Sequence, residues 1–177
     1  MISLPRRSFL KASGVLAALA VADQPEGEPR PGSPALEGGM AVRDITPEPG
    51  LPMWGYSDRE GPALGTLDPL YSKALVLRTA DTTVALVVLD LGRPLPAAAC
   101  DRIRLRASEA GVNHVTLVAT HTHHGPALED EAAPHVRAIE QAIGESILEA
   151  AKALRPIQVG FGSSEVDVAH NRRLILE

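Results

Sequence analysis

A run of imidazoles, His121-Thr122-His123-His124, follows a short apolar segment and precedes a Gly-Pro turn. The apolar segment over residues 115–119 has the length and composition of a buried strand. Because the side chains of a strand alternate between its faces, we expect His121 and His123 to project to the same side. Open α/β sheets bind ligands at the carboxyl ends of their strands. The sequence therefore predicts a metal site or a proton-transfer site here; the alternative is a pair of histidines that only hydrogen-bond to loops.

A zinc ion in a protein takes three or four ligands from histidine, cysteine or carboxylate side chains, and His121 and His123 supply at most two of them. His124 can join them if the chain turns after His123. Asp90 ends another apolar segment, and its carboxylate either accepts the Nδ1–H of a ligating histidine or caps the following loop. We expect His114 and His135 to be ordinary surface or capping residues. His170 ends the last expected strand, and the sequence does not fix its position relative to His121.

The composition is that of one folded domain without a basic surface. The chain has 177 residues, of which 45% are hydrophobic and only 3% aromatic, so the core must be built from Val, Leu, Ile and Ala. The formal net charge is −5 and there is no basic stripe, so we expect no nucleic acid as a partner. Cys100 is the only cysteine. This excludes an internal disulfide bond and predicts a small apolar filler in a helix.

The first 22 residues resemble an export signal. Arg6-Arg7 is followed by Ser8-Phe9-Leu10-Lys11 and a short apolar run that ends at Ala22, the order of a twin-arginine signal peptide. The run is too short for a stable membrane span. We expect export by the twin-arginine translocase to the periplasm or the medium, and a disordered linker over residues 23–39, which are rich in Pro, Gly and Glu. The alternative for residues 1–22 is a basic amphipathic helix.

The pattern of apolar residues beyond the linker predicts alternating strands and helices. Residues 72–78 and 83–90 predict a β-hairpin, and the continuous apolar run 84–89 predicts a strand covered on both faces. A helix over residues 96–110 is expected to end at Gly111, because glycine commonly caps helix C-termini. The remaining expected elements are strands over 40–45, 115–119, 157–160 and 165–170 and a helix over 131–154.

This order of strands and helices predicts an α/β fold with a mixed sheet and flanking helices. A loop over residues 47–70, crowded with Pro, Gly and Asp, interrupts the pattern. So long a loop in a compact domain usually carries function or is misassigned, and we expect its Trp54 and Tyr56 either to meet a lipid surface or to pack on the core. Residues 40–177 end without a capping signal, from which we expect part of a larger domain.

Six blocks of the sequence carry a family pattern in the right order. They are Ala41 to Pro47, Gly50 to Tyr56, Asp68 to Leu77, Ala119 to Pro126, Gly160 to Gly162 and Asn171 to Arg173. Together they resemble the neutral/alkaline, non-lysosomal ceramidase family. The chain departs from that pattern at His124, where the family usually has serine, and at Ala127-Leu128-Glu129, where glycines often follow the Gly-Pro pair.

The resemblance implies a zinc-dependent amidase that cleaves the N-acyl bond of ceramide, a lipid amide, to sphingosine and fatty acid. It implies His121 as a zinc ligand, His123 as an active-site histidine that acts on the bound water or the developing charge, and Arg172 as a contact to substrate or oxyanion. Otherwise Arg172 is a surface charge at a strand end. The family's other zinc ligands are expected beyond Glu177. The alternatives are another exported zinc hydrolase, or a truncated domain that is inactive or only binds a lipid or partner.

Overall fold

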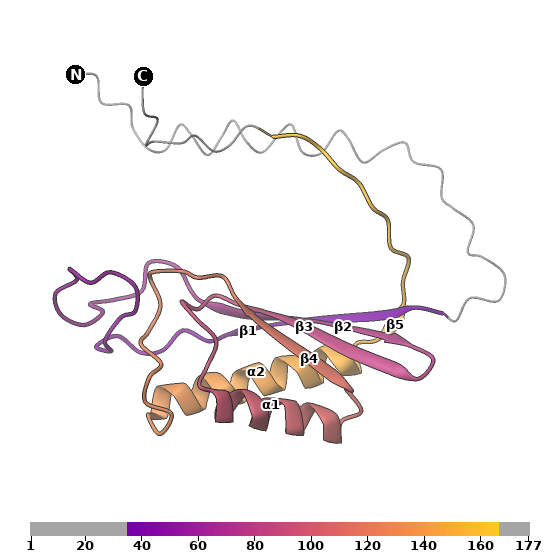
Figure 1. Ribbon diagram of the computed structural model, residues 1–177, viewed down its shortest axis with the longest axis horizontal. Helices are drawn as coiled ribbons and strands as arrows, with labels where there is room; N and C mark the ends of the chain where they lie inside the picture. The colour runs from indigo at the N-terminus through magenta and orange to yellow at the C-terminus, as the bar shows by residue number, and fades with distance from the viewer. Residues whose placement is uncertain (1–34, 167–177) are drawn as a thin grey trace, which may run out of the picture. The chain divides into compact units, whose positions relative to one another are not determined.

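The fold is a mixed five-stranded sheet that carries both helices on one face (Figure 1). The computed structural model describes residues 35–166. The strands lie side by side in the order β4-β3-β2-β1-β5, which confirms the predicted α/β fold with flanking helices. The elements are β1 (Glu37–Asp44), β2 (Tyr71–Thr79), β3 (Thr82–Leu89), α1 (Ala97–Glu109), β4 (His114–Ala119), α2 (Pro134–Lys152) and β5 (Arg155–Pro156).

The sheet combines the predicted hairpin with one parallel pair. Strands β2 and β3 are antiparallel, with Leu75 opposite Leu86, and β1 pairs antiparallel with the other side of β2. The chain then passes through α1 and returns as β4, parallel to β3, with Val87 opposite Leu117. Because β3 and β4 are parallel, their carboxyl ends leave the sheet at the same edge. The histidine run therefore starts beside the segment that follows β3.

The ends of the two helices are set by a glycine and by an aspartate-held turn, and not by the pattern of apolar residues. Helix α1 stops before Gly111 as predicted, and Gly111 has a φ of +82° and donates its N–H to the Ser108 carbonyl at 3.0 Å. Helix α2 begins at Pro134 and not at residue 131. Before it, the Asp130 carboxylate accepts the Ala132 N–H at 2.9 Å, which holds a turn. Proline then suits the first helical position because the N–H that it lacks would have no partner there.

The core lies between the two helices and the sheet. As the composition predicted, it is built from Val, Leu, Ile and Ala, and Cys100 is a buried member at 6% exposure. Burial raises the pKa of the Cys100 thiol, which donates to the Leu95 carbonyl at 3.3 Å. The buried core residues from the strands are Ala74, Val76, Ala85, Val87 and Leu89, and those from the helices include Ala99, Ile103, Ala107, Val136, Ile139, Ile143, Ile147 and Ala150.

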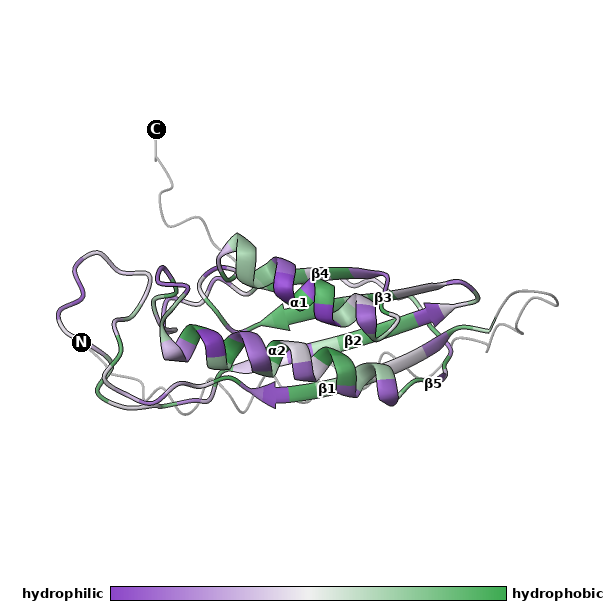
Figure 2. Ribbon diagram, turned by 90° about the horizontal axis from the view of Figure 1, so that it is seen from below, coloured by the Kyte–Doolittle hydropathy of each residue, from purple (hydrophilic) through white to green (hydrophobic). Residues whose placement is uncertain are grey.

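The expectation that residues 84–89 are covered on both faces is wrong within residues 35–166. Ala85, Val87 and Leu89 face the helices and are buried, but Leu86 is 44% exposed on the other face. The strand is hydrophobic over most of its length (Figure 2), yet α1 and α2 both lie on one side of it (Figure 1). Other exposed apolar side chains on this open face are Met40, Val42 and Val118.

Two boundaries differ from the sequence prediction. Strand β1 begins at Glu37, so residues 37–39, which we assigned to the linker over 23–39, belong to the sheet. The strand expected over 157–160 is absent; a two-residue strand, β5, precedes it and pairs with the start of β1. The signal peptide over 1–22, most of the linker, His170, Arg172 and the greater part of the strand over 165–170 lie outside the described residues.

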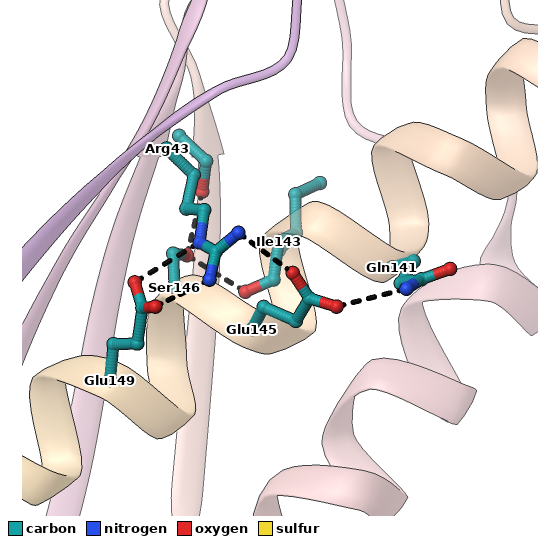
Figure 3. Close-up of polar contacts among 7 residues, drawn as sticks. Arg43, Gln141, Ile143, Glu145, Ser146 and Glu149 are labelled. Atoms are coloured by element: carbon teal, nitrogen blue, oxygen red, sulfur yellow. Dashed lines mark hydrogen bonds and ion pairs between the residues drawn. The ribbon is translucent and has the colours of Figure 1, made fainter.

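An arginine on β1 is paired with two glutamates of α2 (Figure 3). The Arg43 guanidinium lies 2.9 Å from the Glu145 carboxylate and donates through Nε to Glu149 at 3.0 Å. This pairing lowers the pKa of Glu149, chiefly through the hydrogen bond from Arg43. Glu145 also accepts a hydrogen bond from Gln141 at 2.9 Å. The ion pairs connect β1 directly with α2.

The same turn of α2 carries a buried polar contact. The Ser146 hydroxyl donates to the Ile143 carbonyl at 2.8 Å and lies 2.9 Å from the Ser72 hydroxyl of β2. Both serines are fully buried. Since Ser146 donates to the helix backbone, Ser72 is the donor between the two hydroxyls, and each buried group is satisfied.

β1 and α2 approach each other closely at Gly39, which provides a test of this packing. A Cβ at position 39 would lie 2.1 Å from the Ala150 carbonyl oxygen, a backbone atom that cannot rotate away. We predict that Gly39→Ala lowers the free energy of unfolding by about 1–3 kcal/mol, the usual range for overpacking. Urea denaturation measures this. Gly65→Ala is the control, because nothing lies within 4 Å of its Cβ; equal stability losses in the two variants would contradict the packing.

Candidate functional site

Strand β4 ends at Ala119, and the chain follows the extension of β3 for two more residues. The Thr120 N–H donates to the Leu89 carbonyl at 2.9 Å, and the His121 N–H donates to the Leu91 carbonyl at 3.0 Å. His121 then adopts a φ of +62°. A non-glycine residue in this left-handed region is uncommon and persists where its surroundings hold it. The backbone therefore leaves the strand before His123 is reached.

The ring of His121 is held by a backbone carbonyl. Its Nδ1 lies 2.9 Å from the Gly92 oxygen. A carbonyl only accepts hydrogen bonds, so Nδ1 is the donor, and in the neutral ring Nε2 then has a free lone pair. Metal-ligating histidines almost always have their second ring nitrogen held in this way. His121 is an exposed residue, and the donor chemistry of its neutral ring fits a zinc ligand.

The imidazoles of His121 and His123 come together as the sequence predicted, but for a different reason. Their ring centroids are 5.1 Å apart. Strand alternation does not produce this, because both residues lie beyond β4. The indole of Trp54 contacts both rings edge to face, with centroid separations of 4.9 Å to His121 and 5.0 Å to His123. A turn and an aromatic wall thus arrange the pair.

The wall comes from the long loop over residues 47–70, which pairs with the histidine turn. The Trp54 N–H donates to the Gly125 carbonyl at 3.0 Å, and the Ala127 N–H donates to the Pro52 carbonyl at 2.8 Å. Trp54 and Tyr56 neither pack on the core nor stand free: Tyr56 lies against His123, with centroids 4.9 Å apart. Sequence reasoning noted both aromatics but could not match them to residues about 70 positions away.

Gly92 supports the indole as well as the imidazole. A Cβ at position 92 would lie 2.1 Å from Cε3 of Trp54, so the ring packs directly on the glycine backbone. The carbonyl of the same residue accepts from His121. Sequence reasoning missed Gly92, because a glycine that follows a strand usually signals only a turn. One small residue thus sets the positions of both rings.

Among residues 35–166, the Asp90 carboxylate bonds to Tyr71 and Lys73 and to no histidine. Its carboxylate accepts the Tyr71 N–H at 3.2 Å and pairs with Lys73 at 3.0 Å. The Nδ1 of His121 is bound to Gly92 instead. Of the two alternatives that we left open, the orienting role is therefore wrong. Asp90 instead fixes the end of β3 against the start of β2.

The other candidate residues are spread over the described part of the chain. His124 lies at the turn, with its ring centroid 5.9 Å from that of Tyr56. His135 is in the first turn of α2 and bonds to the Ala127 carbonyl at 2.9 Å, while His114 starts β4 at the far edge of the sheet. Within residues 35–166, no group of three or more His, Cys, Asp or Glu side chains is placed to hold a metal ion.

A cavity of about 620 Å³ adjoins the turn but does not open on the imidazole pair. Loop residues such as Leu51, Met53 and Leu70 line one side of it, and the turn contributes His124. Thr120, Thr122 and His124 contribute to its lining, whereas His121 and His123 do not. The imidazole pair therefore lies outside this cavity.

The sequence and the fold of this chain were compared with those of known proteins. No family model matches the chain. Neutral ceramidase of Pseudomonas aeruginosa is 32% identical over 156 residues, which cover 78% of this chain and 23% of the relative. The crystal structure of neutral ceramidase from Pseudomonas aeruginosa superposes with a TM-score of 0.60 at 29% identity, over 70% of this chain and 22% of that one. The predicted resemblance to the neutral ceramidase family is confirmed.

A second structure, a ceramidase complexed with C2, matches this neutral ceramidase-like chain with a TM-score of 0.59 at 28% identity, again over 70% of this chain and 22% of the other. The chain therefore spans less than a quarter of the length of the relatives that it matches. Between residues 35 and 166, no helix has the length and apolar character needed to cross a membrane.

The contact between Trp54 and Gly92 can be tested by fluorescence, because Trp54 is the only tryptophan in the chain. We predict that Gly92→Ala displaces the indole, shifts its emission maximum to longer wavelength and lowers stability by about 1–3 kcal/mol. Gly125→Ala is the control in the same pair of loops, since its Cβ would meet Thr122 at an ordinary 3.6 Å. An unchanged emission spectrum for Gly92→Ala would contradict the packing.

Proposed function

We propose that this chain belongs to an exported, zinc-dependent amidohydrolase that cleaves the N-acyl bond of ceramide or a similar lipid amide. The proposal is supported by the similarity to neutral ceramidase over most of this chain. The observation that carries it is the His121 ring, whose Nδ1 is bound by the Gly92 carbonyl and whose Nε2 is left for a ligand. An imidazole held in this way suits zinc chemistry.

His121 would be the zinc ligand contributed by the described residues, and the remaining ligands would come from outside residues 35–166. When bound, zinc lowers the pKa of a coordinated water to about 7 and polarises an amide carbonyl. The neighbouring imidazole of His123, 5.1 Å away between ring centroids, would exchange a proton with groups beside His121. Arg172, which lies outside the described residues, is proposed to stabilise the oxyanion of the tetrahedral intermediate.

The substrate would be an amide with apolar chains, as the names of the relatives suggest. At the end of the sheet, His121 is exposed and His123 is partly exposed, with the half-exposed Tyr56 beside it. An open site of this kind is accessible to a substrate presented at a lipid surface. Export through the twin-arginine translocase would bring the protein to that surface already folded.

Two histidine substitutions separate metal binding from turnover. In the product of the complete gene, we predict that His121→Ala loses bound zinc and that His123→Ala keeps its zinc but lowers kcat by a factor of about 10²–10⁴, the usual contribution of general acid–base catalysis. Mass-spectrometric metal analysis and hydrolysis of N-acylsphingosine measure these effects. His114→Ala, at the far edge of the sheet, is the control and should change neither.

The result that rejects the zinc assignment is a metal-free wild type, or full zinc content in His121→Ala. Hydrolysis of simple esters without hydrolysis of N-acylsphingosine would instead keep the zinc site and replace the substrate. Absence of both activities from a zinc-loaded protein would favour a binding domain.

The export proposal has a test of its own. Twin-arginine signals depend on the paired guanidinium side chains, so we predict that replacing Arg6 and Arg7 together by lysine retains the precursor in the cytoplasm. Cell fractionation followed by immunoblotting measures the distribution. Lys11→Arg is the control, because it keeps the charge and leaves the pair intact. Equal export of the Arg6/Arg7 double variant and the wild type would exclude this route.

A further inference from the structure

Arg59 connects the aromatic wall with the histidine turn. Its Nη1 donates to the Trp54 carbonyl at 2.9 Å, and its Nη2 donates to the His123 carbonyl at 2.8 Å. The two acceptors are 69 positions apart in the sequence, on opposite sides of the contact between the loops. A guanidinium group presents its donors in a rigid planar fork, so one side chain fixes the spacing between these two carbonyls.

The two residues that Arg59 holds are those that set the imidazole pair. The indole of Trp54 contacts both His121 and His123, and the His123 carbonyl belongs to the second imidazole itself. Between them, Gly55 has a φ of +118°, and a Cβ there would lie 2.7 Å from the His123 Cβ. The loops are thus in direct backbone contact at this point.

Arg59 also supports the outer aromatic ring. Its Cζ lies 5.2 Å from the centroid of the Tyr56 ring, within the range of a cation–π contact. The Tyr56 ring in turn lies edge to face against His123, with centroids 4.9 Å apart. Arg59 therefore contacts both of the aromatic residues, Trp54 and Tyr56, that pack against the His123 ring.

The charge of Arg59 is used differently from that of Arg43 and Arg102. Arg43 and Arg102 each pair with two carboxylates. Among residues 35–166, Arg59 forms no such ion pair; its donors serve backbone carbonyls instead. Charge-assisted hydrogen bonds of this kind are stronger than neutral ones, so the side chain is a strong link between the two loops.

We propose that Arg59 is a positioning residue for the His121–His123 pair. It holds the Trp54 backbone and the His123 backbone at a fixed separation, and the indole then holds both rings. The link to catalysis rests on the proposed function, whereas the geometric part can be measured without metal. Lysine is not equivalent, because a single ammonium group lacks the planar fork.

The experiment follows the histidine ring signals by NMR in the 177-residue chain, without metal. In the wild type, the ring current of Trp54 displaces the carbon-bound proton signals of His121 and His123 from those of exposed histidines, which single His→Gln variants assign. We expect Arg59→Ala to move both sets of signals toward the values of the exposed His114, Arg59→Lys to move them part of the way, and added guanidinium to restore Arg59→Ala in part. Arg104→Ala is the control, since Arg104 pairs only with Asp101 on the exposed side of α1.

A second measurement tests the consequence for the metal. In the product of the complete gene, we expect Arg59→Ala to weaken zinc binding by about tenfold, a typical loss when an outer-shell residue is removed, and Arg104→Ala to leave it unchanged. If the wild type binds no zinc but the imidazole signals still move in Arg59→Ala, the proposed function fails and the positioning role stands.

Unchanged imidazole signals in both Arg59 variants overturn the positioning role, whatever the zinc result. If Arg59→Ala does not fold, as judged by circular dichroism, the lysine variant decides alone. If the imidazole signals of Arg59→Lys then equal those of the wild type, Arg59 is only a general stabilising residue and the positioning role is rejected.

Discussion

Trp54 packs on the bare backbone of Gly92, and the two imidazoles take their places against the same indole. This contact joins three segments that are distant in sequence: the loop over residues 47–70, the end of β3 and the turn after β4. Backbone hydrogen bonds from Trp54 to Gly125 and from Ala127 to Pro52 hold the segments together. Without the indole, His121 would keep its hydrogen bonds to the Gly92 and Leu91 carbonyls and His123 would keep its contact with Tyr56, but the two imidazoles would lose the ring that both of them contact.

The scaffold beneath this contact is simpler. A hairpin and one parallel strand bring two carboxyl ends to the same edge of the sheet, and two helices on one face hold the strands in place (Figure 1). The ion pairs of Arg43 with Glu145 and Glu149 hold α2 against strand β1. The loops at the site can thus lack regular structure because the elements that anchor them are rigid, a common division of roles in α/β proteins.

Much of the scaffold could be predicted from the sequence, because it depends on local patterns. The hairpin, the end of α1 at Gly111 and the strand before His121 all follow from apolar periodicity and glycine chemistry. The start of α2 was placed too early because apolar spacing cannot register a turn held by the Asp130 carboxylate. Covering on both faces of residues 84–89 was predicted wrongly because an apolar strand carries no information about which layers lie beside it.

The site was predictable only in part. The run of histidines identified the place, but strand alternation was the wrong reason, since His121 has already left the strand in a left-handed conformation. Asp90 was considered as a partner for an imidazole because it ends a strand, but its carboxylate forms an ion pair with Lys73 instead. Gly92 and Arg59 carry no signal in a single sequence, because their roles arise from contacts between loops that only the folded chain brings together.

The left-handed backbone of His121 also bears on how such a protein changes under selection. Holding a side chain in this region costs about 1–2 kcal/mol, a cost that glycine avoids. Glycine at position 121 would remove this cost, but it would also remove the hydrogen bond of the ring to the Gly92 carbonyl and the contact of the ring with Trp54. Under selection for stability alone, the backbone strain at position 121 and the contacts of its ring therefore act in opposite directions.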